Sequence, residues 1–292
     1  MKIDNNIYDT ALVFEGGGMR ASYSSGVANA LLENKLYFNY VAGISAGASC
    51  TVNYISRDMP RIKASFVDFV KDPNFGGWRT FLRGKGFFNA EYIYQESCLP
   101  DSDLPFNYEM FMANPADFSI GAYNITKSEL VYWSKSDIVE MNDLMLMVRA
   151  SSTLPIYMPT VEIDGNIYID GGIAGGIAID AAEANGYNKF VFILTRERGY
   201  RKIPPSRTRL LRHTFKDYPE TIETILNRYK VYNSTLERIE QLERDGDAFI
   251  FAPYNMPIDN REKDIRKLEK MYQMGLSQGR KLIPELKEFL KK

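Results

Sequence analysis

The sequence predicts an α/β fold: a mainly parallel central sheet flanked by helices in three layers, with C-terminal helices packed on the same domain. Three observations predict it. Short apolar runs of strand length recur along the chain, segments with helical character separate them, and glycine-rich junctions follow the first two runs, as at the turns between strands and helices.

The apolar runs place the expected strands, and helices are expected in much of the remainder. Strands are predicted at about 11–15, 39–43, 118–123, 129–133, 161–163, 167–170, 189–195 and 248–252. Asp164-Gly165 is a hairpin signal, and the segment Ile179 to Asn185 is predicted to be a crossover helix. The tail from Asn260 to Lys292 is predicted to be helical because its apolar residues fall on one stripe. The stripe comprises Ile265, Leu268, Met271, Tyr272 and Leu276.

One domain is expected over residues 1–292, because no proline-, serine- or glycine-rich linker divides the chain. Its catalytic core should span about 10–195. Residues 196–292 should supply a basic loop, one strand and the C-terminal helices.

The charge balance excludes one class of partner. Lys and Arg total 36 against 37 Asp and Glu, a net charge of -1, so no basic field attracts nucleic acid.

Cys50 and Cys98 lack the spacing of a zinc site and are too few for a disulfide framework, and we expect no metal or cofactor. The N-terminus has no signal-peptide pattern, and no run is long enough to span a membrane. We therefore expect a cytoplasmic protein, unless a route without a cleaved signal exports it.

Ser45 is the candidate nucleophile. It lies in Gly43-Ile44-Ser45-Ala46-Gly47, directly after the apolar run Tyr40-Val41-Ala42. A G-x-S-x-G pentapeptide between a strand and a helix holds its serine on a strained elbow that a substrate carbonyl can approach. An unassisted serine hydroxyl is a poor nucleophile, and the chain contains one histidine, so the base must be sought elsewhere.

A glycine-rich loop follows the first predicted strand, in Glu15-Gly16-Gly17-Gly18-Met19-Arg20. Its backbone N–H groups would be exposed beside the start of a helix, where negative charge is favoured. One interpretation is an oxyanion hole built from Gly16, Gly17 and Gly18, to which Arg20 and the backbone N–H of Ala46 could add. The other is a tight turn or a phosphate-binding loop.

Asp170 is the candidate general base. It ends a predicted strand, and the two residues that follow it, Gly171 and Gly172, leave its carboxylate open to approach. The alternative is an aspartate that merely caps a turn.

In order and spacing, four motifs resemble those of the patatin-like phospholipases. They are Gly16-Gly17-Gly18-Met19-Arg20, Gly43-Ile44-Ser45-Ala46-Gly47, Ala150-Ser151-Ser152-Thr153-Leu154-Pro155 and Asp170-Gly171-Gly172. The resemblance covers about residues 10–195. It implies that Ser45 and Asp170 form a catalytic dyad, that the glycine loop is the oxyanion hole, and that the protein hydrolyses lipid acyl esters. Ala21 departs from the glycine that many members carry after the basic residue.

A full triad is the alternative, because Ser45, Asp170 and His213 follow the chain order of α/β-hydrolases. The single histidine lies between Arg212 and Thr214 in a basic segment, where further positive charge on its ring is disfavoured. We therefore expect His213 to be a surface or packing residue.

Two segments could contact lipid. Phe75 to Phe88 combines aromatics, glycines and cations; Trp78, Phe81, Phe87 and Phe88 are candidate lid or substrate contacts, or their rings pack into the core. Arg196 to Lys216 is a basic, proline-broken stretch that could meet anionic headgroups transiently, or could simply be solvated.

The predicted activity is hydrolysis of phospholipid, lysophospholipid or other carboxylic esters through an acyl-serine intermediate. Two alternatives stay open: acyl transfer to an alcohol on the same dyad, and non-catalytic lipid binding by the same fold.

Overall fold

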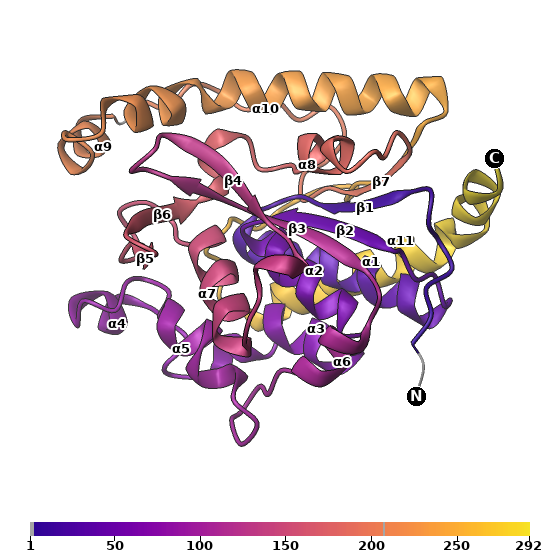
Figure 1. Ribbon diagram of the computed structural model, residues 1–292, viewed down its shortest axis with the longest axis horizontal. Coiled ribbons are helices and arrows are strands. Elements are labelled where there is room, and N and C mark those ends of the chain that lie inside the picture. Colours follow the sequence, from indigo (N-terminus) through magenta and orange to yellow (C-terminus); the bar gives the residue numbers. More distant parts are fainter. Residues whose placement is uncertain (1–2, 207) are drawn as a thin grey trace.

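The computed structural model describes residues 3–206 and 208–292, and it is built in three layers (Figure 1). Within these residues one sheet of eight strands runs in the order β5-β6-β3-β2-β1-β7-β8, with β4 paired to β3. The strands are β1 (Ala11–Phe14), β2 (Tyr40–Ile44), β3 (Asp117–Asn124), β4 (Glu129–Trp133), β5 (Val161–Ile163), β6 (Asn166–Asp170), β7 (Phe190–Ile193) and β8 (Ala248–Phe251). Each lies within two residues of its predicted bounds.

The centre of the sheet is parallel, and the antiparallel pairs involve β3 to β6. β1 pairs with β2 and β7, β2 with β3, and β7 with β8, all in parallel register. Residues of β1, β2 and β7 are completely buried, as expected for parallel strands covered on both faces. The antiparallel hairpin of β5 and β6 turns at Asp164-Gly165, where both residues have positive φ. The predicted fold class is therefore confirmed.

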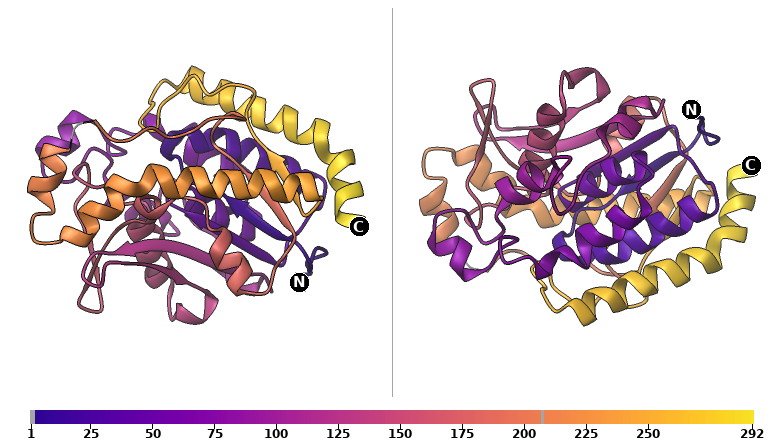
Figure 2. Two further views of the ribbon diagram at one scale, coloured as in Figure 1. Left: turned by 90° about the horizontal axis from the view of Figure 1, so that it is seen from above. Right: turned by 90° about the horizontal axis from the view of Figure 1, so that it is seen from below.

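Helices cover both faces of the sheet. On one face lie α8 (Ile179–Ala184) and the long α10 (Pro219–Asp245), which runs across the sheet in the view from above (Figure 2). The other face is covered by α1 (Ala21–Glu33), α2 (Ala46–Ile55), α3 (Met59–Phe66), α7 (Met141–Ser151) and α11 (Ile265–Lys291). The short helices α4 (Trp78–Leu82), α5 (Ala90–Tyr94), α6 (Tyr108–Ala113) and α9 (Arg209–Thr214) lie toward the periphery.

The helix α11 packs against α1 at very close range (Figure 2). A Cβ added to Gly26 would lie 2.1 Å from the carbonyl oxygen of Tyr272, and one added to Gly275 would lie 2.0 Å from that of Tyr23. The apolar stripe predicted for this helix is buried at Leu268, Met271, Tyr272 and Leu276. Because both crossing positions are glycine, α11 can pack closely against α1, the helix that follows the glycine loop.

The predicted start of the last helix, at Asn260, is wrong by five residues. Asp264 caps α11 by accepting the N–H of Arg266. The residues before it form a turn in which the carbonyl oxygen of Asn260 accepts the N–H of Met19. This turn supports the glycine loop. A helix beginning at Asn260 would use that carbonyl for its own hydrogen bonds, and Met19 would lose its acceptor.

Candidate active site

Ser45 lies on a strained turn between β2 and α2. Its φ of 58° and ψ of -128° fall in a region that non-glycine residues rarely adopt, at a typical cost of about 1–3 kcal/mol. The turn leaves no room beside it, since a Cβ on Gly43 would lie 2.2 Å from the carbonyl oxygen of Gly47. The N–H of Ser45 donates to the hydroxyl of Ser151 over 2.8 Å, and that hydroxyl donates to the carbonyl of Gly121 over 2.5 Å. The sequence did not predict this anchoring role of Ser151.

The hydroxyl of Ser45 donates a hydrogen bond to Oδ2 of Asp170 over 2.7 Å. Asp170 ends β6, and its Oδ1 accepts the N–H of Gly172 over 2.6 Å. Both members of the pair are buried, with 7% and 5% of their surface exposed. The structure thus brings together two side chains that are 125 residues apart in the chain.

The pKa of Asp170 is raised, chiefly because burial disfavours its charged form. Hydrogen bonding from Ser45, the positive charge of Arg228, the N–H of Gly172 and the charge of Lys202 act in the opposite direction. A carboxylate with a raised pKa is a stronger proton acceptor than an ordinary aspartate. The environment of Asp170 therefore favours proton transfer from a hydroxyl.

The glycine loop lies directly against this pair. A Cβ on Gly16 would approach Cβ of Ser45 to 3.1 Å, and Gly18 has a φ of 56°. The N–H of Gly16 donates to the carbonyl of Gly176, so this amide is already engaged. The N–H groups of Gly17, Gly18 and Ala46 find no acceptor among the described residues. These three amides remain available to hold negative charge.

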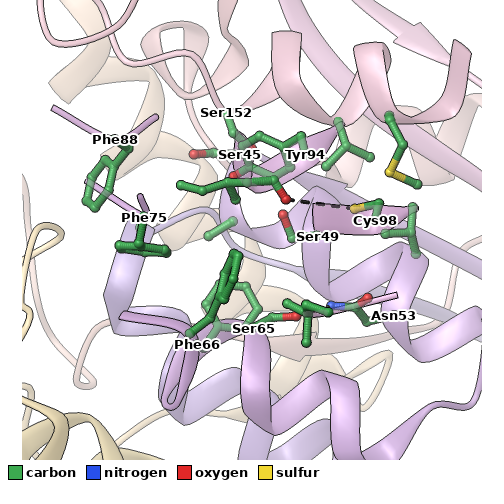
Figure 3. Close-up of a pocket in the computed structure, with 18 of the residues that line it drawn as sticks. Ser45, Ser49, Asn53, Ser65, Phe66, Phe75, Phe88, Tyr94, Cys98 and Ser152 are labelled. Atoms are coloured by element: carbon green, nitrogen blue, oxygen red, sulfur yellow. Dashed lines mark hydrogen bonds between the residues drawn. The ribbon is translucent and has the colours of Figure 1, made fainter. Parts of the chain in front are cut away.

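A pocket opens beside Ser45, between α2, α3, α5 and α7 (Figure 3). Its volume is about 830 Å³ when the part open to solvent is included, within the usual range for small-molecule sites. Ser45, Gly18 and Ala46 line one side. Most of the wall is apolar, and it includes Val52, Phe66, Phe69, Phe75, Phe88, Met145, Val148 and Met158. Such a pocket suits an apolar chain attached to a group at Ser45.

The pocket wall opposite Ser45 carries polar groups, among them Asn53 and Ser65 (Figure 3). There the buried guanidinium of Arg61 donates to Oδ1 of Asn53 over 3.0 Å, to Sγ of Cys98 over 3.2 Å and to the carbonyl of Leu104. All three nitrogens of Arg61 are therefore engaged within the protein. This end of the pocket was not predicted, because nothing in the local sequence of α3 distinguishes Arg61 from a surface arginine.

Residues 75–88 divide between the two predicted roles. Phe75 and Phe88 are buried and line the pocket. Trp78 is 71% exposed, and its ring packs edge-on against Phe81 and Phe87, which in turn contacts Phe88. Of the four predicted contacts, only Phe88 belongs to the pocket wall. The rings of Phe87, Trp78 and Phe81 lie outside the pocket and are linked to Phe88 by ring contacts.

His213 lies exposed on α9, and it makes no hydrogen bond to either member of the serine–aspartate pair. Its predicted place at the surface is confirmed. Arg209, Arg212 and Lys216 are exposed nearby, whereas Arg198 and Arg201 pair with Glu243 and Glu240 on α10. The predicted basic segment is therefore partly solvated and partly held by salt bridges, and Arg207 lies outside the described residues.

Four other cations lie close together near α10, which covers the opposite face of the sheet from the helices that line the pocket (Figure 1). This basic cluster comprises Arg20, Arg196, Lys202 and Arg228. The guanidinium of Arg20 lies among Glu15, Arg196, Tyr200 and Tyr232, and Arg20 does not line the pocket. Arg228 reaches to within 3.3 Å of the position that a Cβ on Gly172 would occupy, beside Asp170.

No helix in the described part of the chain combines the length and apolar character needed to cross a lipid bilayer.

A buried serine–carboxylate pair facing unpaired amides and an apolar pocket is typical of hydrolases that act on esters through a serine. The profile of the patatin-like phospholipases matches residues 12–183, and the chain belongs to this family of lipid hydrolases. A second profile, a domain of unknown function called DUF6363, matches residues 218–291, which include α10 and α11.

Two curated relatives are similar over part of their length. The chain is 25% identical over 187 residues to the uncharacterized protein YjjU of Escherichia coli strain K12, covering 63% of this chain and 51% of that protein. It is 28% identical over 193 residues to the probable lipid hydrolase 463L of Invertebrate iridescent virus 6, covering 60% and 63%. The matches thus span between half and two thirds of these relatives.

Among solved structures, VipD from Legionella pneumophila is similar over 95% of this chain and 67% of its own, with a TM-score of 0.51 and 13% identity. This likeness shows a shared fold.

Proposed function

We propose that the protein hydrolyses carboxylic esters of fatty acyl chains, with Ser45 as nucleophile and Asp170 as general base. The observation that carries the proposal is the 2.7 Å hydrogen bond between a serine on a strained elbow and a buried carboxylate, beside an apolar pocket. Phospholipids, lysophospholipids and simpler esters are the substrate classes consistent with the family.

In the first half-reaction, the oxygen of Ser45 bonds to the ester carbonyl carbon while Asp170 takes the hydroxyl proton. The carbonyl oxygen becomes an oxyanion, which the N–H groups of Gly17, Gly18 and Ala46 can hold. The intermediate then collapses, the bond to the alcohol oxygen breaks, and Asp170 returns the proton to the leaving alcohol. Ser45 is left acylated, with its chain in the apolar pocket.

In the second half-reaction, a water molecule attacks the acyl carbon as Asp170 removes its proton. Collapse of this intermediate breaks the bond to Ser45, which regains its proton, and a fatty acid leaves. Because both steps form an oxyanion, the amides contribute twice. Each such donor typically lowers the barrier by about 2.7–4 kcal/mol.

The exposed part of the 75–88 segment supports contact with a lipid surface. Trp78, Phe81 and Leu82 project from α4 with 71%, 37% and 83% of their surface exposed. The adjacent Arg79, Arg83 and Lys85 can meet anionic headgroups. This helix connects through Phe87 and Phe88 to the pocket, so contact there would bring lipid to the site.

A product screen tests the proposal. Phospholipid, lysophospholipid, acylglycerol and p-nitrophenyl esters are incubated with the wild type, with Ser45→Ala and with Asp170→Asn. We expect both variants to lose at least about 10⁴-fold in kcat, because nucleophile and base act as one unit. A fluorophosphonate should label the wild type and not Ser45→Ala.

His213→Ala is the matched control, since that side chain is exposed on α9 and should be dispensable. Hydrolysis by folded Ser45→Ala at the wild-type rate would refute the proposal. Transfer of the acyl group to an added alcohol in place of water would redirect it to acyl transfer.

A further inference from the structure

The basic cluster brings together four cations from three separate parts of the chain. Arg20 ends the glycine loop, Arg196 and Lys202 follow β7, and Arg228 lies on α10. The ammonium of Lys202 lies 3.1 Å from the centre of the Tyr232 ring, and the guanidinium carbon of Arg196 lies 4.5 Å from that of Tyr200. Aromatic rings thus help to hold two of the four side chains, Arg196 and Lys202, in place.

The cations of this cluster have unused hydrogen-bond donors. None of the four side chains donates a hydrogen bond or forms a salt bridge within residues 3–206 and 208–292. The Nε atoms of Arg20, Arg196 and Arg228 are each shielded from solvent without an acceptor. Unsatisfied buried donors and unpaired charges are unfavourable, so they mark a place where an acceptor is missing.

The carboxylates nearby do not supply that acceptor. Glu15 is buried, but it accepts the N–H of Thr195 over 2.6 Å and the hydroxyl of Tyr232 over 2.7 Å. Asp170 accepts from Ser45 and Gly172. Both carboxylates thus accept hydrogen bonds from groups outside the cluster, and the pKa of Lys202 is lowered to about 6 by burial and by the neighbouring arginines.

Arg228 and Lys202 both lie close enough to Asp170 to act on its charge, so the cluster borders the reacting groups. Each of the four residues is only partly buried and keeps some exposed surface. We propose that the cluster binds the phosphate of a phosphate-bearing acyl ester, such as a glycerophospholipid, while the acyl chain occupies the pocket on the opposite side. This inference rests on the proposed function. Three guanidinium groups match phosphate oxygens in charge and in donor number, and the Lys202 amine adds a donor whose protonated form a bound phosphate would favour.

The test compares a phosphate-bearing ester with a neutral one. For each variant, kcat/KM for a short-chain glycerophospholipid is divided by kcat/KM for a p-nitrophenyl ester of the same acyl chain. Lys202→Met and Arg196→Gln should each lower this ratio about ten- to hundredfold, as expected for a lost charge-assisted hydrogen bond. Lys230→Gln removes an exposed charge on the same helix as Arg228, and it should leave the ratio unchanged.

Direct binding separates this inference from the proposed function. Inorganic phosphate and glycerophosphocholine are titrated by calorimetry into Ser45→Ala, which retains the cluster without the nucleophile. Both should bind, and Lys202→Met in the same background should weaken both at least tenfold. These titrations stand even if no ester is hydrolysed.

Two outcomes would overturn the inference. If neither compound binds and the ratio is the same in all variants, the cluster has no phosphate ligand. If inorganic phosphate binds but glycerophosphocholine does not, and the ratio is unchanged, the cluster takes a free phosphate and not a substrate headgroup. Circular dichroism establishes that each variant is folded, and the two independent variants guard against the collapse of one.

Discussion

The buried cations on the two sides of the serine–aspartate pair differ in whether their donors have hydrogen-bond partners. On the pocket side, all three nitrogens of Arg61 donate to Asn53, Cys98 or a backbone carbonyl. On the α10 side, the side chains of the basic cluster have no such partners among the described residues. A cation whose donors are all hydrogen-bonded can form part of a closed pocket wall, whereas cations with unused donors can bind an anionic ligand. The difference suits an amphiphile, with its chain toward Arg61 and its anionic group toward α10.

Among the changes that compare the two sides, the largest effect is expected at the glycine loop between them. In Gly18→Ala, the new Cβ would lie 2.3 Å from the carbonyl oxygen of Asn260, on a residue with positive φ. The loop must shift, and kcat should fall about 100-fold through loss of an oxyanion donor. Steady-state kinetics with a p-nitrophenyl ester measures the loss.

Gly186→Ala is the matched control, because Gly186 also has positive φ but has open space around its Cβ. An equal loss of kcat in both variants would mean that backbone strain alone, and not the oxyanion donor, accounts for the effect.

A smaller effect is expected at the polar end of the pocket. Ser65→Phe should fill the space opposite Ser45 and displace the end of a longer chain. Excluding two methylene groups should lower kcat/KM about tenfold for an octanoyl ester, and leave an acetyl ester little changed. Ser136→Phe, at an exposed position, is the control. Equal losses for both esters would show that the chain does not extend toward Ser65.

Removing a cation of the basic cluster should change the pKa of the nearby base, Asp170. The pKa of Asp170 is raised by burial and held down in part by Arg228. The proposed mechanism uses the ionised carboxylate, so kcat/KM should fall as the pH is lowered through this pKa. Arg228→Gln removes a positive charge that favours ionisation, and it should move the acid limb to higher pH. The measurement is a pH profile with a neutral ester, with Lys230→Gln as control; an unmoved limb would contradict the coupling.

The smallest effect is on stability. The pKa of Lys202 falls from 10.5 to about 6 on folding, so between these pH values the unfolded chain binds one more proton than the folded one. This lysine therefore costs stability as the pH falls from about 10 to 6, and the cost stays constant below that. Lys202→Met should raise the unfolding temperature near pH 6, by about 2–4 °C for each 1 kcal/mol.

The gain should be much smaller near pH 10.5, where the lysine is neutral in the folded state and about half-protonated in the unfolded one. Thermal unfolding followed at pH 6 and pH 10 provides the measurement. A gain of the same size at both pH values would point to packing of the methionine and not to the buried charge.

Much of the pocket side could be predicted from the sequence. The motifs around Ser45 and Asp170 are local, because an elbow and a strand end are set by a few neighbouring residues, and the structure brings these side chains together. The positions of Phe75 and Trp78 could not be decided in the same way. Both belong to one aromatic segment, yet only packing against the pocket wall distinguishes the buried ring from the exposed one.

By itself, the sequence determined the α/β fold and the identity of the nucleophile and base candidates, because short apolar runs and glycine-rich turns restrict the backbone locally. Tertiary structure alone decided that Arg20, Lys202 and Arg228 lie close together. Their positive charges repel one another, so no local pattern draws them together; the sheet and α10 hold them in place. Charge counted along the chain therefore could not reveal a cluster that exists only in space.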